Sequence, residues 1–157
     1  MDQMRLESDD FEPNADLPWE TTQYGENRSP HLRWRNVPEG TRSLVLIVTD
    51  PDAPDPAAPI RTNVHWTLFN LDPDRGELLP GHGDEQPSAG AQNYTGETGY
   101  LGPKSPKGKH RYFHRLYALD CSLDLPHGAS TPEVEAAMAG HVLAEAELMG
   151  ISEPPAR

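Results

Sequence analysis

The sequence lacks several features that would by themselves indicate where the protein acts. Cysteine occurs once, at Cys121, so the chain can form no internal disulfide, which favours a reducing compartment. No apolar run approaches the ~18 residues that a membrane-spanning helix needs. The first ten residues lack the basic and apolar regions of a signal peptide. From these absences we predict a cytoplasmic protein without integral membrane association.

Positive charge is also scarce. The formal net charge of the 157 residues is −12, which disfavours nucleic acid and anionic membrane surfaces as partners. All three lysines, Lys104, Lys107 and Lys109, lie in one stretch, GPKSPKGKHRY, at residues 102–112. Such a cluster in an acidic chain indicates either an anion-binding loop or an ordinary solvated hairpin.

Several well-known catalytic and metal motifs are absent. The chain has no C-x-x-C pair, no G-x-S-x-G elbow, no Walker loop and no dinucleotide-binding fingerprint. Cys121 has only Asp120 beside it, so packing is a better interpretation than a nucleophilic role. We therefore expect no cofactor and no metal. Five histidines are interpreted as structural, with His141 packing from a helix: His31, His82, His114, His127 and His141.

The 17 prolines and 13 glycines predict many turns and little long helix. Residues 43–50 form an unbroken apolar run that predicts a buried strand, and 64–71 and 111–119 predict two more. Four prolines exclude 51–60 from a central strand. Residues 72–110 are predicted to be mostly loop, and loops of such length are usually functional or disordered.

One helix is predicted near residues 132–149. Ser130 and Glu133 form a capping box, Pro132 suits the first turn, and Gly150 is a suitable stop. Strands followed by a terminal helix predict one mainly β domain over 1–157, an antiparallel sheet with a peripheral helix.

Polar side chains gather at the ends of the predicted strands. Asp50 and Asp52 close the first strand, and in an extended segment they point the same way. Two neighbouring carboxylates require a partner such as an imidazolium or a backbone N–H group. An aspartate beside proline also often caps a turn, and that interpretation stays open.

The other two strands contribute imidazole and phenol groups. His65 lies in the second strand, while His110 and Tyr112 share one face at the head of the third. Backbone N–H groups near Gly102 and the basic rim would complete a small anion site. A nearby aspartate would hold one imidazole in its tautomer or keep it protonated.

In order along the chain, these motifs resemble those of the phosphatidylethanolamine-binding protein family. The resemblance is greatest to its bacterial and archaeal branch, often called Raf kinase inhibitor-like, and extends from about Phe11 to Leu148. The motifs that carry it are NRSP at 27–30, DPDAP at 50–54, HW at 65–66, GPKSPKGKHRY at 102–112 and YALD at 117–120.

The resemblance implies a large antiparallel sheet packed against a smaller one, Greek-key connections and a C-terminal helix. It also implies a shallow pocket at the strand ends that takes phosphate, acetate or a phosphoethanolamine head group. Carried over residue by residue, Asp50 is the main carboxylate, Asp52 and Pro54 shape the wall, the backbone of Gly102 contributes an amide, and the donors are His65, His110 and Tyr112.

The chain departs from the family pattern at two places. The branch usually has GPCPP where this chain has GPKSP at 102–106, which predicts a looser loop and a direct phosphate contact by Lys104. The tail at 153–157 is too short for the segment that closes the pocket in eukaryotic members. This predicts a more open pocket, or one completed by a second subunit in a homodimer.

These observations lead to one principal hypothesis and two alternatives. The principal hypothesis is non-enzymatic binding of a phosphate- or carboxylate-bearing group, such as a phosphoethanolamine-like head group, in a pocket that regulates a partner protein. The first alternative is an inhibitor of a kinase or protease that acts by protein contact. The second is a small hydrolase of esters or phosphoesters that depends on His110.

Overall fold

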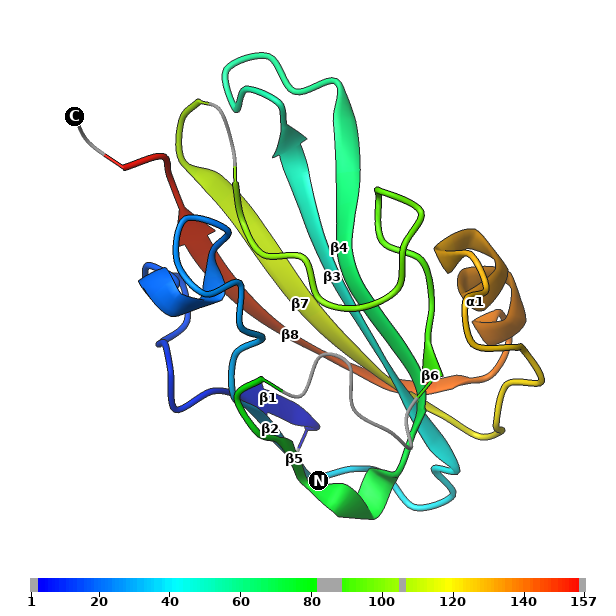
Figure 1. Cartoon of the computed structure of the whole chain (residues 1–157). Helices are drawn as coiled ribbons and strands as arrows, with labels where there is room; N and C mark the ends of the chain where they lie inside the picture. Colours follow the sequence, from blue (N-terminus) through cyan, green and yellow to red (C-terminus); the bar gives the residue numbers. More distant parts are fainter. Residues whose placement is uncertain (1–2, 82–88, 105–106, 156–157) are drawn as a thin grey trace.

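The computed structural model describes residues 3–81, 89–104 and 107–155, so the prediction for His82 lies outside the described residues. Figure 1 shows a small and a large antiparallel sheet. The small sheet has the order β1-β2-β5, with β1 at Arg5–Glu7, β2 at Leu32–Arg35 and β5 at Glu77–Leu78. The predicted mainly β class with two sheets is confirmed.

The large sheet has the strand order β6-β4-β3-β7-β8. Its strands are β6 at Ala89–Gly90, β4 at Arg61–Leu71, β3 at Ser43–Ala53, β7 at His110–Leu119 and β8 at Val142–Ser152. Two short 3-10 helices, η1 at Trp19–Thr21 and η2 at Pro73–Arg75, lie in the connections. Because β7 returns beside β3 rather than beside β4, the connection between β4 and β7 crosses over the sheet.

The central strand β3 is covered on both faces. Leu44, Leu46 and Val48 pack in the core between the two sheets. Val45 and Ile47 point the other way and pack in a second core with residues of the helix α1, at Thr131–Met138. A strand buried on both sides needs apolar residues at every position. The unbroken apolar run at 43–50 is thereby explained, and the predicted buried strand is confirmed.

The strand β3 continues past the predicted proline boundary. Its pairing with β7 ends at Thr49, whereas its pairing with β4 continues to Ala53, opposite Arg61. Pro51 lies in an irregular part of this pairing, where a missing N–H group interrupts no regular ladder. The hairpin of β3 and β4 therefore extends beyond the rest of the sheet (Figure 1).

The predicted helix near 132–149 is wrong beyond Met138. The capping box of Ser130 and Glu133 forms as predicted, but Gly140 adopts a left-handed φ of 82° and turns the chain away from the helix. Residues 142–152 form β8, paired along β7. From Ala146 onward buried positions recur at every second residue, and the same apolar residues also happened to fit a helical period. In the part of the chain that the structure describes, no helix is long and apolar enough to cross a membrane.

Candidate functional site

A cavity of about 150 Å³ opens where the C-terminal end of β3 meets the N-terminal ends of β4 and β7. Five of the eight predicted site residues line it: Asp50, Pro54, His65, Lys104 and Tyr112. The other lining residues are Ala53, Arg61, Asn63 and Tyr94. Pockets for drug-sized ligands usually measure ~300–1,000 Å³. This cavity is therefore smaller than such pockets and has room for a small ligand only.

A β-bulge in β4 sets the position of His65. Val48 of β3 pairs with Trp66, yet the next residue of β3, Thr49, pairs with Val64, so His65 is an extra residue. Bulges re-aim side chains that strict alternation would direct elsewhere. The His65 ring lies edge-on to Tyr112, with 5.1 Å between the ring centroids. The bulge thus brings the imidazole to the phenol of β7.

His65 uses only one of its two ring nitrogens within the described protein. Its Nδ1 donates to the carbonyl oxygen of Leu101 at 2.6 Å. Its Nε2 is buried and has no hydrogen-bond partner among the described residues. Burial lowers the pKa of His65, outweighing the opposing effects of the Leu101 carbonyl and the Asp50 carboxylate. The ring is therefore neutral near pH 7.

Asp50 and His110 form a buried pair beneath the cavity. The Oδ2 atom of Asp50 lies 2.7 Å from Nδ1 of His110, and Nε2 of His110 donates to the carbonyl of Lys107 at 2.8 Å. Both imidazole nitrogens therefore lie against oxygen atoms of the protein. His110 is not a lining residue, and we assign it the role of positioning Asp50.

Asp52 is directed to Arg111 rather than to the cavity. Its carboxylate accepts from the backbone N–H, Nε and one terminal nitrogen of Arg111, at 2.9, 3.0 and 2.9 Å. The hydrogen bonds from the Arg111 side chain are the main reason that the pKa of Asp52 is lowered. Asp52 thus ties the end of β3 to the start of β7, and it is not among the lining residues.

Gly102 also makes its contacts inside the protein. Its N–H donates to Oδ1 of Asn27 at 2.6 Å, and its carbonyl accepts from the Gln23 side chain at 2.9 Å. A Cβ atom at this position would collide with the backbone of Thr21. The glycine is required for close packing of the loop, and its amide is not directed to the cavity.

The three lysines of the loop are not equivalent. Lys104 lines the cavity, whereas Lys107 places its ammonium 3.5 Å from the carboxylate of Asp55. Lys109 is exposed and does not line the cavity. Only one of the clustered cations therefore stands at the site, and Arg61 of β4 supplies a second.

Sequence reasoning missed Arg61, Asn63 and Tyr94. Asn63 lies directly opposite Asp50 in the β3–β4 register, and it alternates with Arg61 along β4. Arg61, Asn63 and His65 occupy alternate positions of β4, and this spacing could have indicated that Arg61 and Asn63 lie near His65. Tyr94 comes from the long connection, and its ring centroid lies 5.1 Å from that of His65. No local pattern links Tyr94 to the strand ends.

A second group of potential ligand atoms lies at the opposite end of β7. Donor atoms of Asp120, Cys121 and His141 all lie within 4.8 Å of one another. His141 is exposed and its Nδ1 lies 2.8 Å from Asp120, so the prediction that His141 packs from a helix is wrong. Proximity alone supports no metal here, and we assign none.

The sequence matches a family profile described as phosphatidylethanolamine-binding protein over residues 7–153. A UPF0098 protein of Methanothermobacter thermautotrophicus is 45% identical over 153 residues, covering 94% of this chain and 97% of that protein. A crystal structure of a phosphatidylethanolamine-binding protein homologue from Chlamydia trachomatis is 36% identical with a TM-score of 0.91, covering 99% of this chain and 100% of that one. YbcL of Escherichia coli is 26% identical with a TM-score of 0.87, covering 98% and 100%.

Proposed function

Because the chain belongs to the phosphatidylethanolamine-binding protein family, we propose that its cavity binds a small phosphate- or carboxylate-bearing group without catalysis. The observation that carries this proposal is the pairing of two cations with a buried polar floor. Arg61 and Lys104 line the cavity and are exposed, while Asp50, His65 and Tyr112 are buried. An anion placed between them would meet positive charge in an otherwise acidic molecule.

The contacts of Asp50 within the protein make this arrangement compatible with an anion. An unpaired carboxylate in the floor would repel a phosphate group at close range. Here both Asp50 oxygens are already engaged, one by His110 and one by the backbone N–H of Asp52 at 2.8 Å. The floor therefore contributes shape and hydrogen-bonding groups, and the rim contributes the net positive charge.

The expected affinity for a bare head group is modest. A hydrogen bond to a charged group contributes roughly 1.5–3 kcal/mol, and two such contacts correspond to a Kd of the order of millimolar. Phosphate and O-phosphoethanolamine, titrated while ¹H–¹⁵N spectra are recorded, test the proposal. Resonances of His65, Lys104 and Tyr112 should shift, while those of His31 beside the small sheet should not. If these three residues fail to respond, the cavity is not the site.

A pair of lysine variants separates local contact from overall charge. Lys104→Ala and Lys107→Ala change the net charge equally, but only Lys104 lines the cavity. We expect Lys104→Ala to weaken phosphate binding about tenfold, equivalent to ~1.4 kcal/mol, and Lys107→Ala to weaken it no more than about twofold. Equal effects of the two substitutions would mean that the loop attracts anions only through its general charge.

The structure bears on the hydrolase hypothesis, whereas the inhibitor hypothesis needs a separate test. Hydrolysis dependent on His110 is less favoured, because both nitrogens of that ring are engaged within the protein. Regulation of a partner protein, a homodimer and a cytoplasmic location remain predictions. Light scattering would measure the oligomeric state. Capture of a partner that survives Asp50→Ala would favour an inhibitor that does not use the cavity.

A further inference from the structure

We propose that this cavity selects anions that carry a proton of their own, so that it prefers inorganic phosphate and phosphate monoesters to phosphodiesters and sulfate. The selecting atom is Nε2 of His65, which is placed to accept a hydrogen bond and not to donate one. The inference rests on the proposed anion-binding function. It adds the chemical class of the ligand.

The position of the proton on the His65 ring follows from its partner. A carbonyl oxygen can only accept a hydrogen bond, so the short contact of 2.6 Å with Leu101 requires the proton on Nδ1. The backbone N–H of Leu101 in turn donates to the carbonyl of His65 at 3.0 Å, which holds the two residues together. In a neutral ring, Nε2 then bears a lone pair.

The free nitrogen is an unusual feature of the floor. His65 is 3% exposed, and buried polar atoms in proteins nearly always have a partner. Among the described residues, Nε2 of His65 and Nε1 of Trp66 are the buried side-chain atoms without one. Because Leu101 occupies Nδ1 and the ring lines the cavity, Nε2 is the atom through which His65 can bond to a ligand.

The surroundings of His65 keep the ring neutral. Burial is the largest influence on its pKa and lowers it, and the nearby His110 acts in the same direction. The backbone of Leu101, the Asp50 carboxylate and the backbone of Gly102 act in the opposite direction and raise the pKa, but the net shift is downward. The titratable and charged groups around the cavity are Asp50 on β3, Arg61 on β4, Tyr94 and Lys104 in the connection, and His110 and Tyr112 on β7.

A lone pair at this position discriminates between oxyanions of the same size. A phosphate monoester has a second pKa of about 6, so it can bind as the monoanion and donate its remaining O–H group to Nε2. Sulfate and phosphodiesters have no such proton near neutral pH, and their oxygens would face the lone pair unpaired. Sites that hydrogen-bond a ligand hydroxyl strongly reject analogues that lack it, so a ratio of at least tenfold is expected.

The direct test uses the wild-type protein and two matched ligand pairs at pH 7.5. Calorimetry would compare phosphate with sulfate, and O-phosphoethanolamine with glycerophosphoethanolamine, which is the corresponding diester with the same amine. We expect at least tenfold tighter binding of phosphate and of the monoester. Affinities within threefold of each other would overturn the selection and leave anion binding intact. If none of the four ligands binds, the proposed function itself is wrong.

A second measurement gives the number of protons taken up when the ligand binds. At pH 7.5 O-phosphoethanolamine is mainly the dianion, so binding as the monoanion must take up close to one proton per site. Titrations in two buffers with different ionisation enthalpies give this number. Uptake near zero would contradict the inference, because the bound ligand would then have no proton to share with Nε2.

A substitution connects the effect to His65. The amide of His65→Gln can donate as well as accept, so the ratio of phosphate to sulfate affinity should fall to threefold or less. Lys104→Ala is the matched comparison, because loss of a rim cation should weaken both anions and preserve their ratio. A His65→Gln protein that melts normally and retains the wild-type ratio would assign the selection to another group.

Discussion

Two buried histidines in different parts of the molecule have opposite surroundings. His31, beside the small sheet, is 4% exposed and His65 is 3% exposed, so burial does not distinguish them. His31 accepts from the backbone N–H of Asp9 at 2.9 Å through Nδ1 and donates to Glu77 at 2.7 Å through Nε2. His65 leaves Nε2 without a partner among the described residues. Both ring nitrogens of His31 are therefore hydrogen-bonded within the protein, whereas Nε2 of His65 remains available to a ligand.

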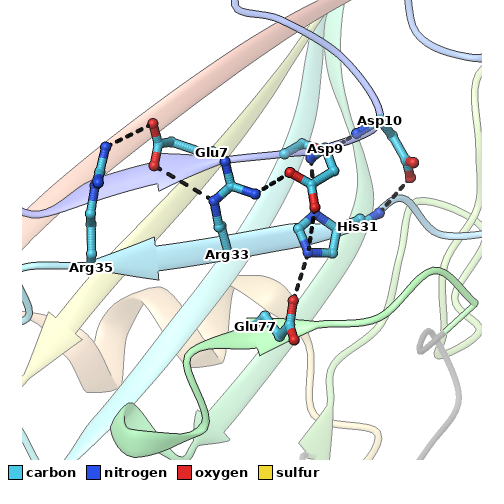
Figure 2. Close-up of polar contacts among 8 residues, drawn as sticks. Glu7, Asp9, Asp10, His31, Arg33, Arg35 and Glu77 are labelled. Carbon is cyan, nitrogen blue, oxygen red and sulfur yellow. Dashed lines mark hydrogen bonds and ion pairs between the residues drawn. The ribbon is translucent and has the colours of Figure 1, made fainter.

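Figure 2 shows the ion pairs and hydrogen bonds among charged residues of the small sheet and its neighbourhood. Arg33 contacts Asp9 and Glu7, and Arg35 contacts Glu7, so that arginines of β2 lie against carboxylates of β1 and the residues after it. The backbone N–H of His31 also donates to Asp10 at 2.8 Å. These contacts join β1 and the residues after it to β2, as expected for a structural network.

Pairing, and not burial, therefore distinguishes a structural histidine from a candidate ligand-binding one. An unpaired buried acceptor costs free energy that a ligand can recover on binding. Natural proteins tolerate such costs mainly at functional sites.

The largest effect concerns a third buried imidazole, His114, which lies on β7. Burial lowers its pKa from 6.5 to about 4, so the native state binds fewer protons than the unfolded state in that range. The contribution of neutral His114 to the free energy of unfolding is therefore fully present above pH 6.5. It is lost as the pH falls towards 4, by up to about 3 kcal/mol. Urea unfolding at several pH values from 7.5 to 4 measures this loss.

Two variants show whether His114 is the source of that loss. His114→Phe removes the titrating group and should flatten the pH dependence. His141→Gln changes an exposed histidine that bonds Asp120, and it should leave the dependence on His114 unchanged. Equal pH dependence in wild type and His114→Phe would assign the acid sensitivity elsewhere.

The next effect separates stability from binding. His31→Leu removes the partner of Glu77 and of the Asp9 N–H group, and we expect a loss of about 2 kcal/mol in the free energy of unfolding. His65→Leu removes one bond to Leu101 but also an unpaired nitrogen, so its stability should remain within about 1 kcal/mol of wild type. Phosphate affinity should fall in His65→Leu and persist in His31→Leu. Urea unfolding and phosphate titration of both variants test the contrast, and the reverse pattern would refute it.

The smallest effect is expected at the exposed end of the small-sheet network. Arg35 contacts Glu7 at 3.2 Å, and its side chain is largely exposed. Surface ion pairs contribute ~0–1 kcal/mol, so Arg35→Gln should change the unfolding free energy by less than about 1 kcal/mol. The same substitution should leave phosphate binding unchanged. A larger loss in urea unfolding would indicate that the network acts as one cooperative unit.

Much of the fold could be predicted from local patterns. The apolar run at 43–50 predicted the central strand, because a strand covered on both faces must be apolar throughout. The capping box at Ser130 predicted the start of α1. The length of α1 could not be predicted, because the apolar residues after Gly140 fit two periods. Only their pairing with β7 decided for a strand.

The candidate site divides in the same way. Strand boundaries and local spacing were enough to predict that Asp50, His65 and Tyr112 lie at the strand ends. Tertiary structure decided which of the predicted residues reach the cavity. The bulge turns His65, Arg111 draws Asp52 away, and Asn27 occupies the amide of Gly102. Register, bulges and loop contacts depend on residues far apart in the chain, and no local pattern records them.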